Sequence, residues 1–521
     1  MDDYRCYLLK LGGKLSSVFY KLLTMPTVST PYHIISIPYH TDSTVLFNRI
    51  RALPFACWLD SGKPKSYSGR YDVMTAQPSR RWVTEGSKTS IMDYHYALEN
   101  GNGDYQETTA NITDENPLTI INQASEQLAS NYQQNHSSID GAFDPSLDLP
   151  FTGGVIAYFS YELGRQQANI PQLSPSDCDL PEMVAGLYEW AVVQDHQIQT
   201  SYIVALPDCD TAVINAVKQL MATHQADTIT AKDVDGNKNA THSFSIDKLS
   251  ANITNAQYRR KLSTINDYIQ AGDCYQVNFA QCFKAKYKGD PYIAYLTLRQ
   301  EMASPFSAFM DLGGKAILSL SPERFLQTQK QHVLTQPIKG TIGRDNDSAA
   351  DQKNAQMLQE STKNQAENVM IVDLLRNDLG KSCSPGSIHV PKLFALESFP
   401  NVHHLVSNVE GTLENGKTAM DLFEGCFPGG SITGAPKKRA MEIIEELEDC
   451  QRSIYCGSIA YINNNGDMDS NITIRTIACD GVNLFCWGGG GIVADSDIEE
   501  EYQESLTKID KILDVLTSFS D

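Results

Sequence analysis

Two residues of the chain, Glu323 and Lys339, have side chains that could act as an acid and a nucleophile. Glu323 directly follows the apolar segment 316–321, and burial next to such a strand raises a carboxyl pKa. Lys339 lies between Pro337, which fixes its own φ, and Gly340, which allows a close backbone approach. A lysine amine becomes nucleophilic only when its surroundings lower its pKa. A β-hairpin over 319–327 and 332–338 would bring the two side chains together; otherwise Glu323 pairs with Arg324 and Lys339 is solvated.

Two glutamates are candidate metal ligands. Glu367 lies near the start of segment 363–379, which is apolar on almost all sides and predicts a buried helix. Arg376 in that segment is expected to form an ion network with Asp373 and Asp378.

Glu504 lies in the C-terminal amphipathic segment, four residues before Lys508. This pair is either a surface salt bridge or one metal carboxylate and one substrate-directed ammonium.

Glycine-rich segments and isolated polar residues add possible ligand contacts. Segment 428–437 precedes a predicted helix at 439–448, and loop amides at a helix N-terminus bind anions. Segment 488–491 consists of four glycines after a predicted strand at 483–487, which permits close backbone contact or a bulge. Arg475, in a predicted strand at 471–477, could bind a carboxylate with two hydrogen bonds. Gln276 and Asn278 alternate on one strand face, directed either into a cleft or toward water.

The candidate ligands are oxygen atoms without a His/Cys cluster, which favours Mg²⁺ over zinc. Together, these groups indicate chemistry on a small carboxylated substrate.

The elements that must position these residues follow from periodicity and turn signals. Strands are expected within 31–75, 151–165 and 183–206, and helices at 117–132 and 255–271. Polar segments 100–116 and 133–148 are predicted loops. Segment 226–242 has the composition of a linker, so we place an organisational boundary near residue 245 without assuming two independently folding parts.

Composition excludes several function classes. The chain has 521 residues, 42 basic and 63 acidic side chains, and a net charge of −21, which argues against nucleic acid or an anionic membrane as the main partner. No apolar run is long enough to span a bilayer. The 12 cysteines include no CxxC pair, and residues 1–25 fit neither a signal nor a transit peptide, so a cytoplasmic location is expected.

Several motifs in order resemble the chorismate-utilising enzymes. They are Ser-Pro-Glu-Arg-Phe at 321–325, Pro-Ile-Lys-Gly-Thr at 337–341, Ala-Glu-Asn-Val-Met-Ile-Val-Asp-Leu-Leu-Arg-Asn-Asp at 366–378, Val-His-His-Leu-Val at 402–406, Gly-Ser-Ile-Thr-Gly-Ala-Pro-Lys at 430–437 and Gly-Gly-Gly-Ile-Val-Ala-Asp-Ser at 489–496. Segments 59–62 and 150–154 extend the resemblance into the N-terminal part. It implies a large two-lobed α+β fold, with antiparallel sheets in a sandwich core and helices packed outside. The expected division is an extension at 1–28, an N-terminal region at 29–245 and a chorismate-binding catalytic region at 246–521.

Within this family, the chain resembles the aminodeoxychorismate synthases, because it has lysine at 339 and glutamine at 276. Anthranilate synthases carry alanine at the position of Lys339, and isochorismate and salicylate synthases carry a lysine at that of Gln276. The resemblance implies that Glu323 protonates the leaving 4-hydroxyl of chorismate while Lys339 attacks C2. Ammonia then attacks C4 and expels the lysine, giving 4-amino-4-deoxychorismate, a step toward p-aminobenzoate and folate.

The resemblance also assigns binding roles. Glu367 and Glu504 would hold Mg²⁺ at the ring carboxylate. The other residues expected to hold or line the substrate are Gln276, His404, Thr433, Gly434, Tyr455, Arg475, Gly489, Gly490, Gly491 and Lys508.

Two further partners are implied. No glutaminase triad stands out in the sequence, so a separate glutamine amidotransferase subunit would supply ammonia. L-Tryptophan is the second, in an N-terminal pocket whose expected lining is Ser61, Tyr67, Arg70, Tyr71, Pro305, Phe306 and Ser307. As an alternative, these seven residues are ordinary core and turn positions.

Two other functions stay open from the sequence. One is anthranilate synthase activity, which would release pyruvate. The other is a non-catalytic regulator that binds chorismate or tryptophan, although the presence of Glu323, Lys339, Glu367 and Glu504 argues against it.

Overall fold

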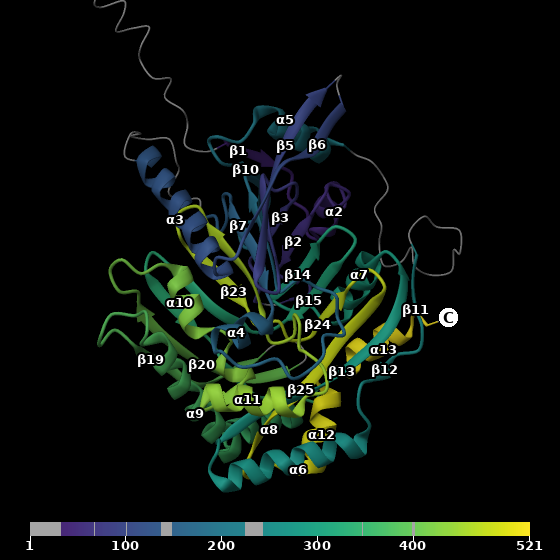
Figure 1. Ribbon diagram of the computed structural model, residues 1–521, viewed down its shortest axis with the longest axis vertical. Coiled ribbons are helices and arrows are strands. Elements are labelled where there is room, and N and C mark those ends of the chain that lie inside the picture. Colours follow the sequence, from purple (N-terminus) through teal and green to yellow (C-terminus); the bar gives the residue numbers. More distant parts are fainter. Residues whose placement is uncertain are drawn as a thin grey trace, which may run out of the picture.

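Two large antiparallel sheets form the centre of the computed structural model (Figure 1). The structure describes residues 33–66, 68–99, 102–136, 148–223, 243–345, 347–398 and 402–520. The strands of the first sheet are, in spatial order, β1 (His33–Ile37), β10 (Thr200–Ala205), β9 (Trp190–Asp195), β3 (Tyr71–Thr75), β2 (Cys57–Asp60), β14 (Phe306–Asp311), β15 (Ala316–Ser321), β24 (Thr476–Cys479), β25 (Asn483–Val493), β13 (Gln276–Gly289) and β11 (Phe244–Ile246), with β12 (Ser250–Ala251) and β21 (Gly434–Ala435) also paired to β13.

The second sheet carries the segments that follow Glu323. Its strands are, in spatial order, β18 (Ile338–Gly343), β20 (Val402–Thr412), β17 (His332–Thr335), β16 (Arg324–Gln329), β23 (Met468–Asn471), β22 (Ser458–Asn463), β7 (Gly154–Phe159), β8 (Met183–Tyr188), β4 (Arg80–Glu85), β5 (Lys88–Glu99) and β6 (Asn102–Thr113), with β19 (His389–Ser398) also paired to β20.

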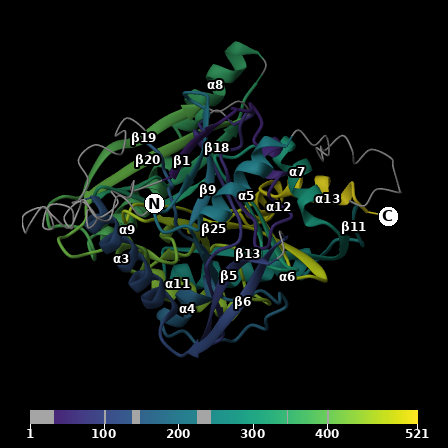
Figure 2. The same cartoon turned by 90° about the horizontal axis from the view of Figure 1, so that it is seen from above.

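Helices lie outside the sheets, which agrees with the predicted α+β sandwich (Figures 1 and 2). Figure 2 shows α8 at the periphery of the molecule. The described helices are α2 (Thr44–Phe47), α3 (Pro117–His136), α4 (Tyr161–Gln167), α5 (Thr211–Ala222), α6 (Asn255–Ala271), α7 (Pro291–Glu301), α8 (Ser348–Gln359), α9 (Thr362–Leu379), α10 (Ala419–Cys426), the 3₁₀ helix η2 (Gly430–Ile432), α11 (Lys437–Leu447), α12 (Ile498–Thr507) and α13 (Asp510–Thr517). Among the described helices, none is both long enough and apolar enough to cross a bilayer.

Strands from both sides of residue 245 share each sheet. In the first sheet β14 pairs with β2, so that Ser307 lies opposite Asp60. In the second sheet β22 pairs with β7, so that Ser458 lies opposite Phe159. The three-part division of the chain stays a prediction, but the two larger regions contribute to common sheets.

Several elements agree with the sequence patterns. Helix α6 has the predicted bounds because Thr254 and Gln257 form a capping box at its start and Gly272 adopts a left-handed conformation at its end. Strands β7 to β10 also lie where they were expected, whereas α3 continues past its predicted end at 132 to His136, into the start of the segment 133–148 that was predicted as a loop.

Other local predictions were wrong. Segment 100–116, predicted as a loop, contains β6, because β5 provides a partner strand that outweighs its polar composition. The C-terminal helix divides at Ile509 into α12 and α13. Helix α9 is not buried on all sides, since the side chains of Asp373 and Arg376 are 64% and 51% exposed. Within the described part of the chain Arg376 pairs with Asp373 and not with Asp378, which pairs with Lys381 and Lys437.

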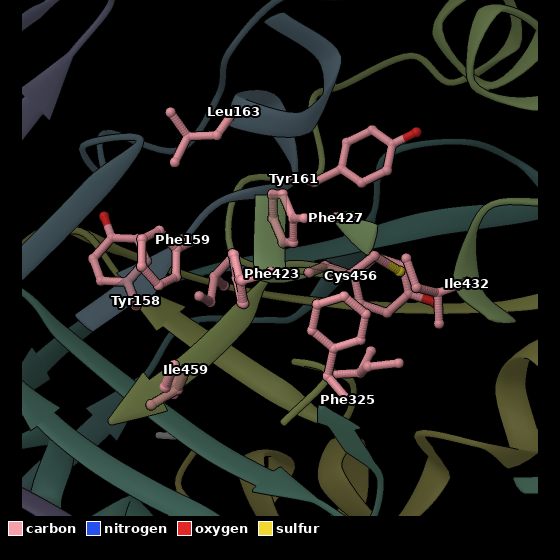
Figure 3. Packing of buried hydrophobic residues seen from close by; sticks show 14 of the residues in the cluster. Tyr158, Phe159, Tyr161, Leu163, Phe325, Phe423, Phe427, Ile432, Cys456 and Ile459 are labelled. Carbon is pink, nitrogen blue, oxygen red and sulfur yellow. The ribbon is translucent and has the colours of Figure 1, made fainter. Parts of the chain in front are cut away.

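An aromatic cluster supports the segments around Glu323. Phe423 and Phe427, from α10 and the residue after it, stack with ring centroids 5.0 Å apart. Phe325 on β16 contacts Phe423 edge-on at 5.5 Å, and Phe159 on β7 lies 4.7 Å from Phe423 (Figure 3). Because Phe325 is two residues from Glu323, this dense packing restricts the backbone on which the acid is carried.

Candidate active site

Glu323 and Lys339 both contact Ser431, which lies in η2. The Ser431 hydroxyl donates to Oε1 of Glu323 at 3.0 Å, and Nζ of Lys339 donates to the Ser431 carbonyl at 3.3 Å. A hairpin is present as β16 and β17, and it leads into β18, which carries Lys339. Its predicted first strand over 319–327 was wrong, because β15 ends at Ser321 in the first sheet and β16 begins at Arg324 in the second. The hairpin and η2 therefore bring the predicted acid and the predicted nucleophile to one residue.

Burial shifts both side chains toward their neutral forms. It raises the pKa of Glu323, a shift that Lys339 and the Ser431 hydroxyl oppose. Burial also lowers the pKa of Lys339, against the attraction of Glu367 and Glu323. A protonated carboxyl and an unprotonated amine are the forms that general acid catalysis and nucleophilic attack need.

Three carboxylates and two lysines lie beside this pair. Glu367 comes from α9, whereas Glu504, Glu501 and Lys508 come from α12 and its C-terminal end. Lys508 Nζ lies 2.7 Å from Glu504 and donates to the Gly489 carbonyl at 3.2 Å. Lys363 Nζ lies 3.3 Å from Glu501. Glu504 and Lys508 thus form the predicted salt bridge and also contact the glycine strand.

The pKa values of the two predicted metal ligands are shifted in opposite directions. Burial raises the pKa of Glu367, although Lys339 and Lys363 oppose this shift. Burial acts in the same direction on Glu504, but attraction to Lys508 outweighs it, so the pKa of Glu504 is lowered.

The donor set is compatible with Mg²⁺. Among the described residues, no group of three or more His, Cys, Asp or Glu side chains is arranged to hold a metal ion. Mg²⁺ is commonly held by one or two carboxylates together with water and substrate oxygens, so the glutamate pair from α9 and α12 suits it. Whether Glu367 and Glu504 bind Mg²⁺ stays a prediction.

The four glycines form part of strand β25, not a loop. A Cβ atom on Gly489 would lie 2.3 Å from the Phe279 carbonyl oxygen, and one on Gly491 would lie 2.4 Å from Nε2 of Gln276. A Cβ on Gly490 would have Glu501, Lys508 and Glu504 as its nearest neighbours, at 3.4 to 3.8 Å. The glycines therefore let β13 and the polar groups of α12 approach the β25 backbone closely.

Gln276 and Asn278 do not face water. Gln276 is fully buried on β13, and both polar atoms of its amide lack a hydrogen-bond partner in the described structure. The Asn278 side-chain oxygen also lacks one. Because an unpaired buried amide is costly, these groups favour a polar ligand beside Gly491.

Arg475 interacts with the acid, and His404 lies near Arg475. Arg475 lies between β23 and β24 with φ of 51°, so the predicted continuous strand over 471–477 was wrong. Its guanidinium forms no hydrogen bond or ion pair within the described part of the chain, and burial lowers its pKa, against attraction to Asp510 and Glu323. His404 lies on β20, where Nδ1 is 2.7 Å from the Thr341 hydroxyl. Burial and Arg475 lower the pKa of His404 to about 4, so its ring is neutral at pH 7.

The remaining predicted substrate residues lie around η2 and before β22. Thr433 is fully buried and donates to the Gly429 carbonyl at 2.9 Å. Gly434 adopts φ of +143°, and a Cβ there would lie 2.1 Å from the Gln276 carbonyl oxygen. Tyr455 stacks on Trp487 with centroids 6.2 Å apart, next to Arg452.

Six of the seven predicted tryptophan residues line one cavity of about 980 Å³. These are Ser61, Arg70, Tyr71, Pro305, Phe306 and Ser307, whereas Tyr67 lies outside the described residues. The Ser61 hydroxyl is buried and has no partner in the described structure. Arg70 pairs with Asp195 at 2.8 Å and lies over the Tyr71 ring.

Three residues near the site escaped the sequence reasoning. Ser431 lies within the recognised Gly-rich motif, but only tertiary structure brings its two polar atoms to Glu323 and Lys339. Glu501 is 3% exposed and accepts from Ser496 at 2.6 Å. Its position one helical turn before Glu504 was an available signal. Lys363, four residues before Glu367, offered the same signal.

Comparison with known proteins places the chain in a family. Residues 84–514 match the model of the chorismate binding enzyme family. Aminodeoxychorismate synthase component 1 of Salmonella typhimurium is 40% identical over 481 residues, covering 92% of this chain and 97% of that protein. Anthranilate synthase component 1 of Thermus thermophilus is 35% identical over 364 residues, covering 70% of this chain and 77% of that one. The crystal structure of anthranilate synthase component I from Streptococcus pneumoniae matches with a TM-score of 0.68 at 28% identity, covering 85% of this chain and 92% of that one. This chain belongs to the chorismate-binding enzyme family.

Proposed function

We propose that the chain converts chorismate and ammonia into 4-amino-4-deoxychorismate and water through a covalent intermediate on Lys339. The observation that carries this proposal is that a buried acid and a partly buried amine both contact Ser431. The relatives named aminodeoxychorismate synthase component 1, at 40% identity over most of both chains, support the same reaction.

The two side chains divide the chemistry. Glu323 donates its proton to the 4-hydroxyl, which leaves as water, while unprotonated Lys339 forms a bond to C2 and the ring double bonds shift. Ammonia then bonds to C4, the double bonds shift back, and the Lys339 nitrogen leaves C2. Glu323 recovers a proton from the incoming nitrogen, so the enzyme returns to its starting state.

Substrate binding is assigned to cations and amides around this pair. Arg475, whose guanidinium forms no ion pair within contact distance in the described structure, would pair with a substrate carboxylate, and Lys508 would hold another next to the β25 amides. The unpaired amide of Gln276 would donate to the substrate. Glu367 and Glu504 would hold Mg²⁺, which neutralises carboxylate charge when it is bound.

Two partners belong to the proposal. A glutamine amidotransferase subunit would supply ammonia, and the product would enter p-aminobenzoate and folate synthesis in the cytoplasm. L-Tryptophan would occupy the cavity next to Ser61, whose buried hydroxyl could accept one hydrogen bond from its ammonium group.

The test uses the full chain with chorismate, Mg²⁺ and ammonium. Mass spectrometry should detect 4-amino-4-deoxychorismate and a transient mass increase on the peptide that contains Lys339. Lys339→Ala should lose the adduct and reduce turnover by at least about 100-fold, since nucleophilic catalysis is removed. Anthranilate with pyruvate as the product would establish anthranilate synthase activity instead.

A further inference from the structure

The cavity beside Ser61 and the active site share one wall. Pro322, Arg324, Gln336 and Ile338 line the cavity, whereas Glu323 and Lys339 face the active site. Successive side chains of an extended segment point to opposite faces, so each reacting residue has neighbours directed into the cavity. We use the term shared wall for residues 322–324 and 336–339.

The backbone ladder does not hold the shared wall in regular register. Regular pairing of β16 with β17 runs only from Gln327 to Gln329, opposite Leu334 to His332. The register of β16 with β23 shifts between Arg324 and Gln327. The register of β18 with β20 shifts in the same way between Ile338 and Thr341. Both reacting residues therefore lie next to irregular pairing, where side chains must contribute to their placement.

One guanidinium bridges the two halves of this wall. Arg324 binds Asp469 on β23 through two hydrogen bonds of 3.0 Å, and its third nitrogen donates to Oε1 of Gln336 at 2.8 Å. The same group lies 4.9 Å from the centroid of the Phe306 ring. The alternative that Arg324 pairs with Glu323 was therefore wrong, because the two adjacent side chains point to opposite faces.

The surrounding contacts fix this guanidinium in place. Its side chain is 19% exposed and that of Asp469 is 15% exposed. Gln327 donates to Asp469 at 3.2 Å, and Gln336 donates to Asn408 on β20 at 3.2 Å. Arg324 thus connects β23, the segment before β18 and, through Gln336, β20.

We propose that Arg324 is a positioning residue that clamps the shared wall, so that Glu323 and Lys339 meet at Ser431. It touches no reacting atom, and it acts on the reaction through the backbone of residues 322–324 and 336–339. The kinetic test of this inference rests on the proposed function, whereas the contacts of Arg324 do not depend on it. A lysine cannot replace this arginine, because an ammonium lacks the planar donors that bind Asp469 and Gln336 together.

The kinetic test compares Arg324→Lys, Gln336→Met and the double variant, with ammonium as the nitrogen source. Arg324→Lys should lower kcat about 10- to 100-fold, since small misplacements of reacting groups have effects of that size. KM for chorismate should change less than about 3-fold, because the proposed binding groups lie on other elements. Gln336→Met should act in the same direction, and the double variant should be no worse than Arg324→Lys, because both remove one bridge.

A matched control is Arg80→Lys, which alters an exposed two-bond pair with Asp93 on β4 and β5, away from the wall. It should leave kcat unchanged. An unchanged kcat in Arg324→Lys would overturn the inference. So would a double variant in which the loss of kcat equals the product of the losses in Arg324→Lys and Gln336→Met. If Arg324→Lys does not fold, as judged by its melting transition, Gln336→Met alone decides, because it leaves the Arg324–Asp469 pair in place.

A second readout does not require the proposed reaction. Labelling of Lys339 by an amine reagent, followed by mass spectrometry over a pH series, reports when the amine loses its proton. A loosened wall admits water to Lys339, so its labelling midpoint should move to higher pH in Arg324→Lys and Gln336→Met but not in Arg80→Lys. If the unaltered chain forms no product, the proposed function fails. The labelling series still tests whether Arg324 positions the shared wall, because it does not depend on the reaction. Identical midpoints in all four proteins would refute the clamp.

Discussion

At the scale of residues, the reacting amine is held in an environment that disfavours its charge. Lys339 is an ordinary lysine by sequence, but burial lowers its pKa while Glu367 and Glu323 restore only part of the loss. A side chain kept in this condition for reactivity lowers the stability of the folded state. Removal of the amine should therefore separate stability from activity.

Lys339→Met should melt about 1–4 °C higher than the unaltered chain at pH 7 and should lose turnover. The folded state binds the Lys339 proton less tightly than the unfolded state, so the protonated amine lowers the free energy of unfolding at neutral pH. This destabilisation decreases as the pH rises from the lowered pKa of Lys339 in the folded state toward the ordinary lysine pKa of about 10.4 in the unfolded state. Thermal melts over a pH series check this, with the exposed Lys353→Met as control. A lower melting temperature for Lys339→Met throughout the series would contradict the argument.

The Glu504 carboxylate gives a second prediction at this scale. Glu504→Gln should raise the Mg²⁺ concentration needed for half-maximal activity by about 10-fold, since it removes a proposed anionic ligand. Stabilisation of the chorismate complex by Mg²⁺, measured by thermal melts, should weaken in parallel. The control is Glu500→Gln, an exposed position on the same helix. An unchanged Mg²⁺ response in Glu504→Gln would remove this residue from the metal site.

At the scale of elements, strand β25 is shaped by how closely its neighbours approach. Helix α12 rests directly on it, since a Cβ at Gly488 would lie 2.5 Å from the Ser505 carbonyl oxygen. This close contact brings Glu504 and Lys508 to the backbone at Gly489 and Gly490. The glycines thus allow α12 to pack closely on β25 and leave backbone exposed to the proposed ligand.

Alanine at adjacent glycines should separate these two roles. Gly489→Ala places Cβ against the Phe279 backbone carbonyl and should destabilise the fold by about 2 kcal/mol or more. In Gly490→Ala the nearest neighbours of the added Cβ are the ends of the Glu501, Lys508 and Glu504 side chains, so the protein should fold normally. Its added methyl should instead raise KM for chorismate about 10-fold by occupying the ligand side of the strand. Denaturant unfolding and steady-state kinetics check the pair, and equal losses of stability in both variants would refute the distinction.

At the scale of the whole molecule, the acid and its partners depend on both regions of the chain. Glu323 follows β15, whose sheet neighbour β14 pairs on its other side with β2. Strand β22 pairs with β7 throughout its length. The catalytic region therefore lacks edge partners for two of its strands when it is alone.

A fragment of residues 243–521 should not unfold cooperatively by itself. Loss of β2 and β7 leaves unpaired backbone groups and exposes part of the apolar core. Co-expression with residues 1–242 should restore a cooperative transition and chorismate turnover. Circular dichroism melts and activity measurements test this, and a fragment that melts cooperatively and turns over chorismate alone would show independent folding.

Local signals determined much of the architecture in advance. The capping box and the terminal glycine of α6 are adjacent in sequence to the helix they limit, so its bounds were predictable. The hairpin leading to Lys339 was predictable because its strands and turn are contiguous. Motif order determined the family, and with it the expected fold and reaction.

Tertiary structure decided what depends on partners distant in sequence. The sequence alone could not show that β6 finds a partner in β5, that the β25 glycines continue a strand, or that Arg475 lies between strands. Nor could the sequence alone show that Ser431 contacts both Glu323 and Lys339, or that Arg324 binds Asp469 and Gln336. The physical reason is that strand pairing, burial and pKa shifts arise from neighbours in space. The chain itself therefore specified which groups could react, and the assembled sheets determined which of them meet.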